Sequence, residues 1–369
     1  MVTAIVKPTH DCNLACRYCY LEPNAEQGRM SYKTLASLME QVAKYSKDKS
    51  SHFIWHGGEP LLMGLDFYEE AAQISHFLRR RGYHVSNGIQ SNGTLVNDHL
   101  LSFIEREDDF QLGLSLDGPR HINNRTRVYR DGRGAFDEIF SGVKKVRDYS
   151  IEHSKRQRYI GGGVIVVLSS ANANDLVEIY QFFKKEQVNI KINPVILCGK
   201  ATNELSLTPQ QYAKALNKLF DVWIKEEETM DVDPFTTIMG NLMTQCPVSC
   251  NFSPSCRKDF VSIGPQGDIY PCGRFDGIRE FWLGNVNENG GLAKAIESEI
   301  QRNLACRSAK TVIGCDSCNF QNVCNAGCMH NAHTAGDVMG KDPYCAAYKG
   351  IFSHIEAFLH KELRRVELQ

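Results

Sequence analysis

The chain has 369 residues, of which 42% are hydrophobic and 23% are charged, a composition typical of a soluble globular protein of about two domains. Its 42 basic and 43 acidic residues leave no net charge that would attract nucleic acid or a membrane surface. Apolar runs such as Val164 to Leu168 fall far short of the ~20 residues that a membrane-spanning helix needs. Lys7 and His10 interrupt any signal-peptide core, so we expect a cytoplasmic protein that binds neither nucleic acid nor membranes.

The segment from Cys12 to Cys19 places three cysteines in eight residues, directly after the apolar run from Ala4 to Val6. Three thiols can converge on one metal centre only if this segment leaves the end of a strand as a loop. A 4Fe-4S cluster held by three cysteines keeps one iron open for a further ligand, whereas a structural zinc needs a fourth protein ligand. No cysteine or histidine follows closely. The pattern therefore favours an open cluster, with an incomplete zinc site as the alternative.

Helices and strands then alternate along the chain. Ser31 caps an amphipathic helix that runs to Tyr45, and a short buried strand over residues 52–55 ends in the turn Gly57-Gly58-Glu59-Pro60. Further helices are predicted at 67–80, 98–106, 135–148 and 175–186, and further strands at 85–90, 111–116, 161–168 and 188–196. Strands separated by helices of this length pair in parallel, and catalytic groups gather at their carboxyl ends.

Fourteen cysteines in a reducing compartment indicate metal ligation rather than disulfides. Besides the first three, a second set is dense from Cys246 onward: Cys250, Cys256, Cys272, Cys315, Cys318, Cys324, Cys328 and Cys345. Eight thiols suffice for two closed four-cysteine sites. A zinc ribbon is an alternative for Cys315, Cys318, Cys324 and Cys328. Cys246 and Cys306 fall outside the pattern, while Cys198 fits either a group facing the active site or a small buried residue.

The three-cysteine loop, with the aromatic Tyr18 before the third cysteine, resembles the signature loop of radical S-adenosylmethionine (radical SAM) enzymes. The resemblance implies that the amine and carboxylate of SAM chelate the open iron. It also implies a partial (β/α)6 barrel, an α/β fold, over residues 1–215. The SAM-contacting residues implied by this resemblance are Tyr18, Gly57, Gly58, Glu59, Asn92, Ser115, Asp117 and Arg127. Arg127 would hold the SAM carboxylate, the alternative being a solvated charge.

The second cysteine set resembles the SPASM domain of radical SAM enzymes that mature peptides and proteins, a domain with two auxiliary 4Fe-4S clusters. The resemblance implies that Cys250, Cys256, Cys272 and Cys328 ligate the first auxiliary cluster. Cys315, Cys318, Cys324 and Cys345 would then ligate the second. The expected cofactors are three 4Fe-4S clusters and SAM. We expect a helical linker over 216–245 and the SPASM domain with a C-terminal helix over 246–369.

Anaerobic sulfatase-maturating enzymes, which oxidise a cysteine or serine side chain to formylglycine, carry an aspartate immediately after the third auxiliary cysteine. Here Gly273 stands in that place, and Asp276 is a tentative substitute for the base. We therefore expect a maturase that abstracts a side-chain hydrogen from a ribosomally made precursor peptide with a 5′-deoxyadenosyl radical. The net two-electron oxidation would form a carbon–carbon (cyclophane-type) or thioether cross-link, with sulfatase maturation as the alternative.

The implied partners are the precursor peptide and a reductant such as flavodoxin or ferredoxin. Because the cluster loop begins at Cys12, we expect precursor recognition at the barrel mouth, around residues 205–234, or by a separate leader-peptide-binding protein. A non-enzymatic interpretation is an iron–sulfur electron carrier or redox sensor. Such a protein would need neither an open three-cysteine loop nor the Gly57–Pro60 turn, and both are present.

Overall fold

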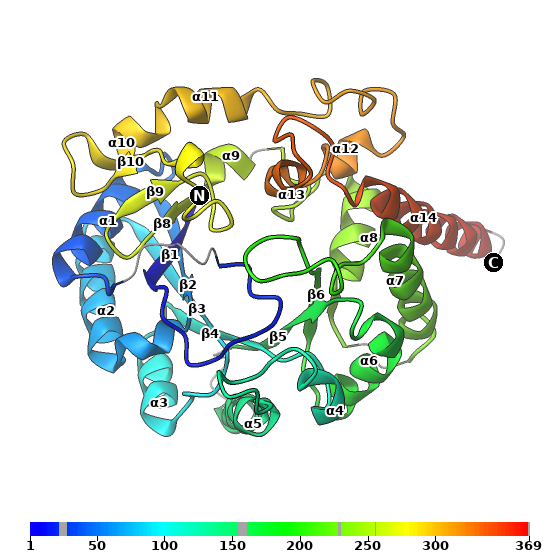
Figure 1. Ribbon diagram of the computed structural model, residues 1–369, viewed down its shortest axis with the longest axis horizontal. Helices are drawn as coiled ribbons and strands as arrows, with labels where there is room; N and C mark the ends of the chain where they lie inside the picture. Colours follow the sequence, from blue (N-terminus) through cyan, green and yellow to red (C-terminus); the bar gives the residue numbers. More distant parts are fainter. Residues whose placement is uncertain (22–27, 154–160, 228–229, 255, 368–369) are drawn as a thin grey trace.

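The computed structural model describes the chain except for residues 22–27, 154–160, 228–229, 255 and 368–369. Within the described residues, ten strands form a single sheet in the order β10-β9-β8-β1-β2-β3-β4-β5-β6-β7. Every neighbouring pair from β8 through β1 to β7 is parallel, and β9 and β10 continue the sheet with antiparallel pairs. Figure 1 shows the sheet curving into an arc, with helices on its outer side. The predicted α/β class and partial barrel are confirmed.

The elements have the following bounds. The strands are β1 Val2–Thr9, β2 Ser50–Gly57, β3 His84–Ser91, β4 Phe110–Ser115, β5 Gly161–Leu168, β6 Ile190–Pro194, β7 Val232–Asp233, β8 Phe260–Ile263, β9 Asp268–Tyr270 and β10 Gly284–Asn285. The helices of the barrel are α1 Tyr32–Tyr45, α2 Leu65–Arg80, α3 Asp98–Arg106, α4 Arg120–Asn123, α5 Phe136–His153, α6 Leu176–Lys185 and α7 Pro209–Trp223. The later helices are α8 Phe235–Thr244, α9 Cys256–Asp259, α10 Gly291–Ile296, α11 Glu299–Ala305, α12 Gln321–Cys324, α13 Met329–Thr334 and α14 Cys345–Glu367.

Local sequence signals explain why the barrel helices begin where they do. The side chain of Ser31 accepts a hydrogen bond from the amide of Thr34 and so caps α1, as predicted. Asn97 caps α3 in the same way, and Thr208 forms a reciprocal capping box with Gln211 at the start of α7. These caps satisfy amides that would otherwise lack partners at the first turn, so each helix starts at a defined distance from the strand that precedes it.

The predicted strand at 188–196 is shorter in the structure, because it begins only at Ile190. Gln187 has a positive φ of 55°, and the amide of Val188 bonds back to the carbonyl of Phe183 at 3.0 Å. These two residues therefore close the end of α6 instead of extending β6. The predicted helix at 135–148 is longer, since α5 continues to His153.

The sheet extends beyond the predicted barrel into the cysteine-rich part of the chain. The register of β8 against β1 pairs Thr3 with Phe260 and Val6 with Ile263. One sheet therefore passes through all three predicted segments, and the division into domains at 215 and 245 stays a prediction. Residues 228–229 of the predicted linker lie outside the described residues.

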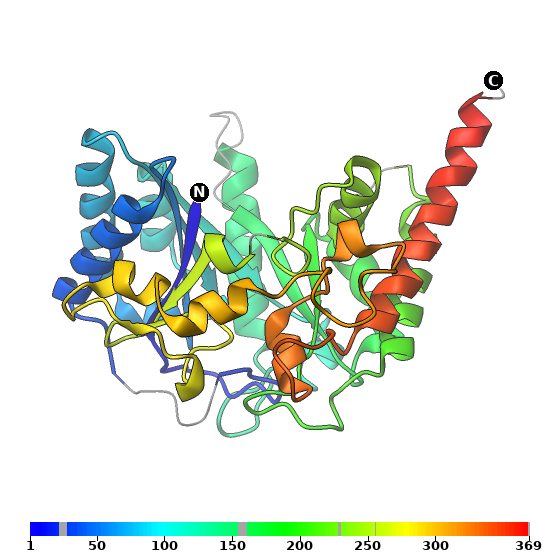
Figure 2. The same cartoon turned by 90° about the horizontal axis from the view of Figure 1, so that it is seen from above.

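The C-terminal elements lie across the open side of the arc (Figure 1), and α14 runs alongside α7 in both ribbon views (Figure 2). Tyr344, just before α14, donates a hydrogen bond to the carbonyl of Val195 at 3.0 Å, and its ring packs on Tyr212 of α7 at 5.2 Å. These contacts hold the cysteine-rich segment over the carboxyl ends of the barrel strands. Across the described part of the chain, the helices are either too short or too polar to cross a lipid bilayer.

Candidate active site

A cavity of about 330 Å³ lies between the carboxyl ends of the barrel strands and the cysteine-rich segment. Eight residues of the predicted SAM and cluster site line it: Cys12, Cys16, Tyr18, Cys19, Gly57, Gly58, Asn92 and Ser115. Arg127 lines it as well, together with four cysteines of the second set, Cys250, Cys256, Cys272 and Cys328. The structure thus brings residues from both ends of the chain to one cavity. Glu59, Asp117 and Asp276, which were also predicted for the site, are buried behind its wall.

The three-cysteine loop leaves the end of β1 and is held by backbone hydrogen bonds to a distant segment. The amide of Ala15 donates to the carbonyl of Val128 at 2.7 Å, and the amide of Arg17 donates to that of Thr126 at 2.9 Å. Burial raises the pKa of the Cys12 thiol to about 12 and that of Cys16 to about 11. These two thiols would stay protonated at neutral pH without a metal, whereas iron stabilises the thiolate form. Three soft donors in one half-buried loop suit an iron–sulfur cluster.

The Gly57-Gly58 turn packs directly on the start of the cysteine loop. Gly57 has a φ of +114°, and a Cβ at Gly58 would lie 2.0 Å from the carbonyl oxygen of Asp11. The amide of Gly58 donates to the carbonyl of Thr9 at 3.1 Å, and the amide of Glu59 donates to that of Asp11 at 2.8 Å. Both glycines are therefore required because two backbone segments meet here, at the wall of the cavity.

Glu59 connects the ends of β2 and β3. Its carboxylate is fully buried and accepts hydrogen bonds from the amide of Leu61 at 3.0 Å, the hydroxyl of Ser91 at 2.9 Å and the amide of Asn92 at 2.7 Å. Burial raises the pKa of Glu59 to about 7, although the three hydrogen bonds act in the opposite direction. The Glu59 carboxylate is therefore hydrogen-bonded to other groups of the protein.

Asn92 extends this hydrogen-bond network to the cysteine loop. Its side-chain amide donates to Asn13 Oδ1 at 2.8 Å and lies 3.8 Å from the sulfur of Cys12. On the next strand, the hydroxyl of Ser115 accepts a hydrogen bond from Gln90 Nε2 at 3.0 Å. Polar side chains at the carboxyl ends of β3 and β4 thus lie where the sequence predicted them, on the cavity wall.

Asp117, Arg127 and Tyr18 form a buried charged cluster on the other side of the loop. Arg127 Nε lies 3.1 Å from Asp117 Oδ2, and its guanidinium stands 5.5 Å from the centre of the Tyr18 ring. The Tyr18 hydroxyl donates to Asp117 Oδ2 at 2.5 Å, and burial is the main cause that raises the Tyr18 pKa. Arg127 is only 5% exposed, so the interpretation of this residue as a solvated charge is wrong.

The eight cysteines of the second set fall into two groups of four. Cys250, Cys256, Cys272 and Cys328 line the large cavity, while Cys315, Cys318, Cys324 and Cys345 line a separate small pocket. These are the two groups that the sequence resemblance implied, and their roles as ligands stay a prediction. Burial raises the pKa of Cys272 to about 11. This thiol, too, would therefore need a bound metal to remain a thiolate at neutral pH. Cys328 precedes α13 and Cys345 begins α14, where the helix dipole stabilises negative charge.

Asp276, the tentative base, lies in a buried ion-pair network. Its Oδ2 is 3.0 Å from Lys7 Nζ and 3.0 Å from His10 Nε2. Burial alone would raise the pKa of Asp276, but Lys7 and then His10 outweigh it, so the net shift is downward. A carboxylate held in its charged form by two neighbours is a weaker proton acceptor.

Sequence reasoning missed several polar residues of the cavity, and the basic ones that line it or stand beside it are His56, Arg274 and Lys7. His56, immediately before the Gly57 turn, lines the cavity, and burial lowers its pKa to about 4, so the ring is neutral. Arg274, two residues after Cys272, also lines it. Lys7 is a fully buried charge within β1, and a lysine in an otherwise apolar strand is the signal that could have found it. Cys198 lines the cavity as well, whereas Cys246 and Cys306 are exposed.

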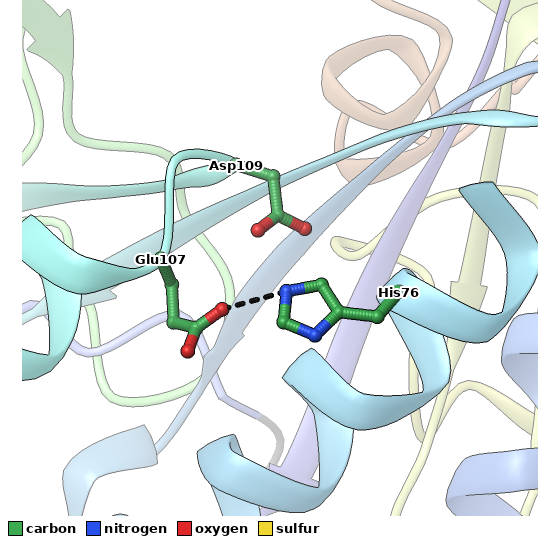
Figure 3. A group of neighbouring side chains, drawn as sticks. All are labelled: His76, Glu107 and Asp109. Atoms are coloured by element: carbon green, nitrogen blue, oxygen red, sulfur yellow. Dashed lines mark ion pairs between the residues drawn. The ribbon is translucent and has the colours of Figure 1, made fainter. Parts of the chain in front are cut away.

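A further cluster of side chains suited to metal binding lies at the opposite end of the barrel, before β4. Figure 3 shows His76 pointing toward Glu107 and Asp109, with His76 Nε2 2.9 Å from Glu107 Oε2. Arg106 lies 3.2 Å from Glu107, and Arg79 lies 3.3 Å from Asp109. These arginines already neutralise both carboxylates, so the cluster is better described as an ion-pair network of the barrel base.

Comparison with known proteins agrees with this geometry. Residues 6–183 match the radical SAM superfamily, and the chain therefore contains a radical SAM domain. It is related to anaerobic sulfatase-maturating enzymes: the cysteine-type enzyme of Clostridium novyi is 27% identical over 367 residues, covering 95% of this chain and 94% of that protein.

Two solved structures share the fold. Native anSMEcpe with bound AdoMet and Cp18Cys peptide superposes with a TM-score of 0.85 at 22% identity, covering 99% of both chains. Streptococcus suis SuiB bound to precursor peptide SuiA has a TM-score of 0.67 at 14% identity, covering 92% of this chain and 74% of that one. The fold of this chain therefore recurs in proteins whose structures hold AdoMet or a peptide.

Proposed function

We propose that the protein is a radical SAM maturase that oxidises a side chain of a ribosomally made precursor peptide by two electrons and forms a side-chain cross-link. Three considerations support this proposal: the radical SAM domain, the relationship to sulfatase-maturating enzymes, and a cavity lined by seven thiols that the prediction assigns to clusters. The likeness to the peptide-bound structures of anSMEcpe and SuiB agrees with a peptide as substrate.

The donor set of the cavity fits the cofactors that the family uses. Cys12, Cys16 and Cys19 would hold the cluster that binds SAM, and the Gly57–Gly58 backbone, Asn92 and Ser115 would surround the nucleotide. When bound, the cluster and SAM supply the one-electron chemistry that abstracts hydrogen from an unactivated carbon. The chain itself contributes orientation and exclusion of water. Apolar side chains such as Ile165, Val167 and Phe260 line the remaining wall of the cavity.

The observation that favours a cross-link is the absence of acidic side chains from the cavity wall. Among the described residues that line the cavity, none is an aspartate or a glutamate. Gly273 stands beside Cys272, and the nearby Asp276 is held as a carboxylate by Lys7 and His10. Oxidation of a side-chain alcohol or thiol to an aldehyde benefits from a positioned base. Addition of a side-chain radical to an aromatic ring, followed by loss of one further electron, would instead leave a ring proton acidic enough to depart without a positioned carboxylate.

Sulfatase maturation is the second candidate, because the relative from Clostridium novyi carries that name and aligns along nearly its whole length. The two candidates differ in the product that they leave on a peptide. A cross-link removes two hydrogens and leaves no carbonyl, whereas formylglycine carries an aldehyde.

The test is anaerobic incubation of the reconstituted protein with SAM, dithionite and one of two peptides: a short peptide encoded beside its gene, or a cysteine- or serine-containing sulfatase peptide. We expect 5′-deoxyadenosine, loss of about 2 Da per event from the encoded peptide, and no reaction of the product with a hydrazide probe. A hydrazide-reactive sulfatase peptide would favour the second candidate. Absence of 5′-deoxyadenosine would favour an electron carrier or redox sensor.

We also propose that a flavodoxin or ferredoxin supplies the electrons and that the protein acts in the cytoplasm, where thiols stay reduced. Three clusters would bring about twelve irons per chain. Iron analysis of anaerobically purified protein tests that number directly.

A further inference from the structure

His56 lines the large cavity with an imidazole ring whose two nitrogens differ in their surroundings. Its Nδ1 accepts a hydrogen bond from the amide of Gly57 at 2.8 Å, and the hydroxyl of Tyr20 lies 3.5 Å from the same atom. Because an amide donates to Nδ1, the proton of the neutral ring is on Nε2. Within the described part of the chain, Nε2 itself makes no hydrogen bond. His56 therefore offers an unused N–H donor on the cavity wall.

The ring of His56 is neutral and held in one orientation. Burial lowers the pKa of His56 to about 4, and the charge of Lys7 acts in the same direction. Tyr20 packs edge-on against His56 with the ring centres 5.9 Å apart, and Lys7 Nζ stands 5.1 Å from the centre of the Tyr20 ring. A neutral, oriented N–H donor suits an acceptor such as a carbonyl oxygen, whereas an ammonium or amide N–H group would find no acceptor on Nε2.

Tyr20, the neighbour of His56, lies between the two predicted cluster sites of the cavity. It follows Cys19 directly in sequence. Burial is the main cause that raises the pKa of Tyr20, and the nearby charges that modify this shift include Cys19 and Arg274. Arg274 stands two residues after Cys272 and lines the cavity. The proposed reaction takes a hydrogen atom and then an electron from one peptide side chain, so that side chain has to lie between SAM and the four-cysteine group on the cavity.

We propose that His56 binds the substrate peptide, with Nε2–H donating a hydrogen bond to the backbone carbonyl of the residue that loses hydrogen. The inference rests on the proposed function, because that function takes a peptide as substrate. Polar neighbours on the cavity wall are already engaged: on and just after β3, the strand beside β2, Gln90 donates to Ser115 and Asn92 donates to Asn13. A bond to the backbone does not depend on the side chain, so it would position different target residues in the same way.

The test uses the full-length, anaerobically reconstituted protein and the short peptide encoded beside its gene. His56→Phe keeps an aromatic ring but removes the donor. We expect it to raise KM for the peptide about tenfold, to change kcat by less than about twofold and to leave KM for SAM unchanged, because one binding contact is lost. The Kd of the fluorescently labelled peptide, measured by anisotropy with SAM and without reductant, should rise by the same factor. His56→Gln, which keeps an N–H donor, should retain most of the affinity.

His52 provides the matched control. It lies four residues earlier on the same face of β2, bonds Ser86 through Nδ1 at 2.8 Å and does not line the cavity, so His52→Phe should leave both KM values and the Kd unchanged. Replacement of the peptide carbonyl oxygen by sulfur, a weak acceptor, should raise the Kd of the wild-type protein but not that of His56→Phe. If His56→Phe loses iron, His56→Gln and the sulfur-substituted peptide still test the contact.

The outcomes separate this inference from the proposed function. Equal peptide Kd values for the wild-type protein and His56→Phe would overturn the inference alone. A rise in KM for SAM without one for the peptide would assign the Nε2 donor to SAM and would also overturn it. A wild-type protein that cleaves SAM but neither binds nor modifies the peptide would overturn the proposed function together with the inference.

Discussion

Substitution of Lys7 by methionine tests the buried ion pair that joins β1 to the cysteine-rich segment. Lys7 Nζ lies 3.0 Å from Asp276 Oδ2, and their side chains are 1% and 3% exposed. At an effective dielectric constant of about 20, two unit charges at this distance attract each other by about 5.5 kcal/mol. Desolvation offsets much of that gain, but removal of one partner leaves a buried charge. We therefore expect Lys7→Met to lower the free energy of unfolding by about 3–5 kcal/mol.

The assay is urea unfolding of the cluster-loaded protein under anaerobic conditions, with the double variant Lys7→Met/Asp276→Asn measured in parallel. The double variant should recover at least half of the loss, because it removes the orphaned carboxylate. Lys191→Met is the matched control: Lys191 of β6 pairs with Asp233 of β7 at 2.5 Å in the same sheet, but it is 50% exposed, so its loss should cost less than about 1 kcal/mol. Equal effects of the two lysine substitutions would refute the reasoning.

The lowered pKa of Asp276 adds a pH dependence to this prediction. The pair contributes its full stability above the ordinary aspartate pKa of about 3.9, and this contribution is lost as the pH falls through the lower folded-state value. Lys7→Met should weaken this acid dependence, because only His10 then opposes the effect of burial on the Asp276 pKa. An unchanged acid limb in the variant would mean that the Lys7 charge does not set the Asp276 pKa.

Three further predictions concern the cavity wall and the clusters. Gly58→Ala places a Cβ 2.0 Å from the Asp11 carbonyl and should cost about four irons and SAM cleavage, whereas Gly240→Ala, with open space around it, should cost neither. The pKa of Glu59 is raised to about 7, so its contribution to stability is complete below the ordinary glutamate pKa and falls as the pH rises through 7. In urea unfolding, Glu59→Gln should flatten this decline of the unfolding free energy with pH. An unchanged decline would exclude Glu59 as its cause. Cys345→Ala should lose about four irons, and Cys306→Ala, an exposed thiol, should lose none; equal iron contents would contradict the assignment.

The sequence was sufficient to predict the barrel because each element carries its own local signal. The apolar spacing from Leu35 to Ala43 and the cap at Ser31 define α1 without reference to the rest of the chain. The strands end in polar turns, so Asn92 and Ser115 could be placed at their carboxyl ends and hence on one wall. The grouping of the eight later cysteines came from a family resemblance, since spacing alone left a zinc ribbon open.

The remaining features depend on contacts between distant residues, which local patterns do not encode. The pairing of Thr3 with Phe260 was missed because a four-residue strand in a cysteine-rich segment gives no indication of its partner. Asp276 was named as a base from its proximity to Cys272, whereas its environment is set by Lys7 and His10 more than 260 residues away in sequence. Arg274 likewise donates a hydrogen bond to Asn331, which donates one to Asp342, and no sequence pattern indicated these contacts.

The position of β8 beside β1 has a consequence for synthesis of the protein. β1 emerges from the ribosome long before β8, which pairs with its outer edge, because Phe260, the partner of Thr3, is synthesised much later. At about 5–20 residues per second, that delay amounts to about 13–50 seconds. During this time β1 presents an unpaired and largely apolar edge, the kind of surface that promotes aggregation of nascent chains. Slow translation or a shortage of chaperones should therefore reduce the yield of soluble protein before any cluster is inserted.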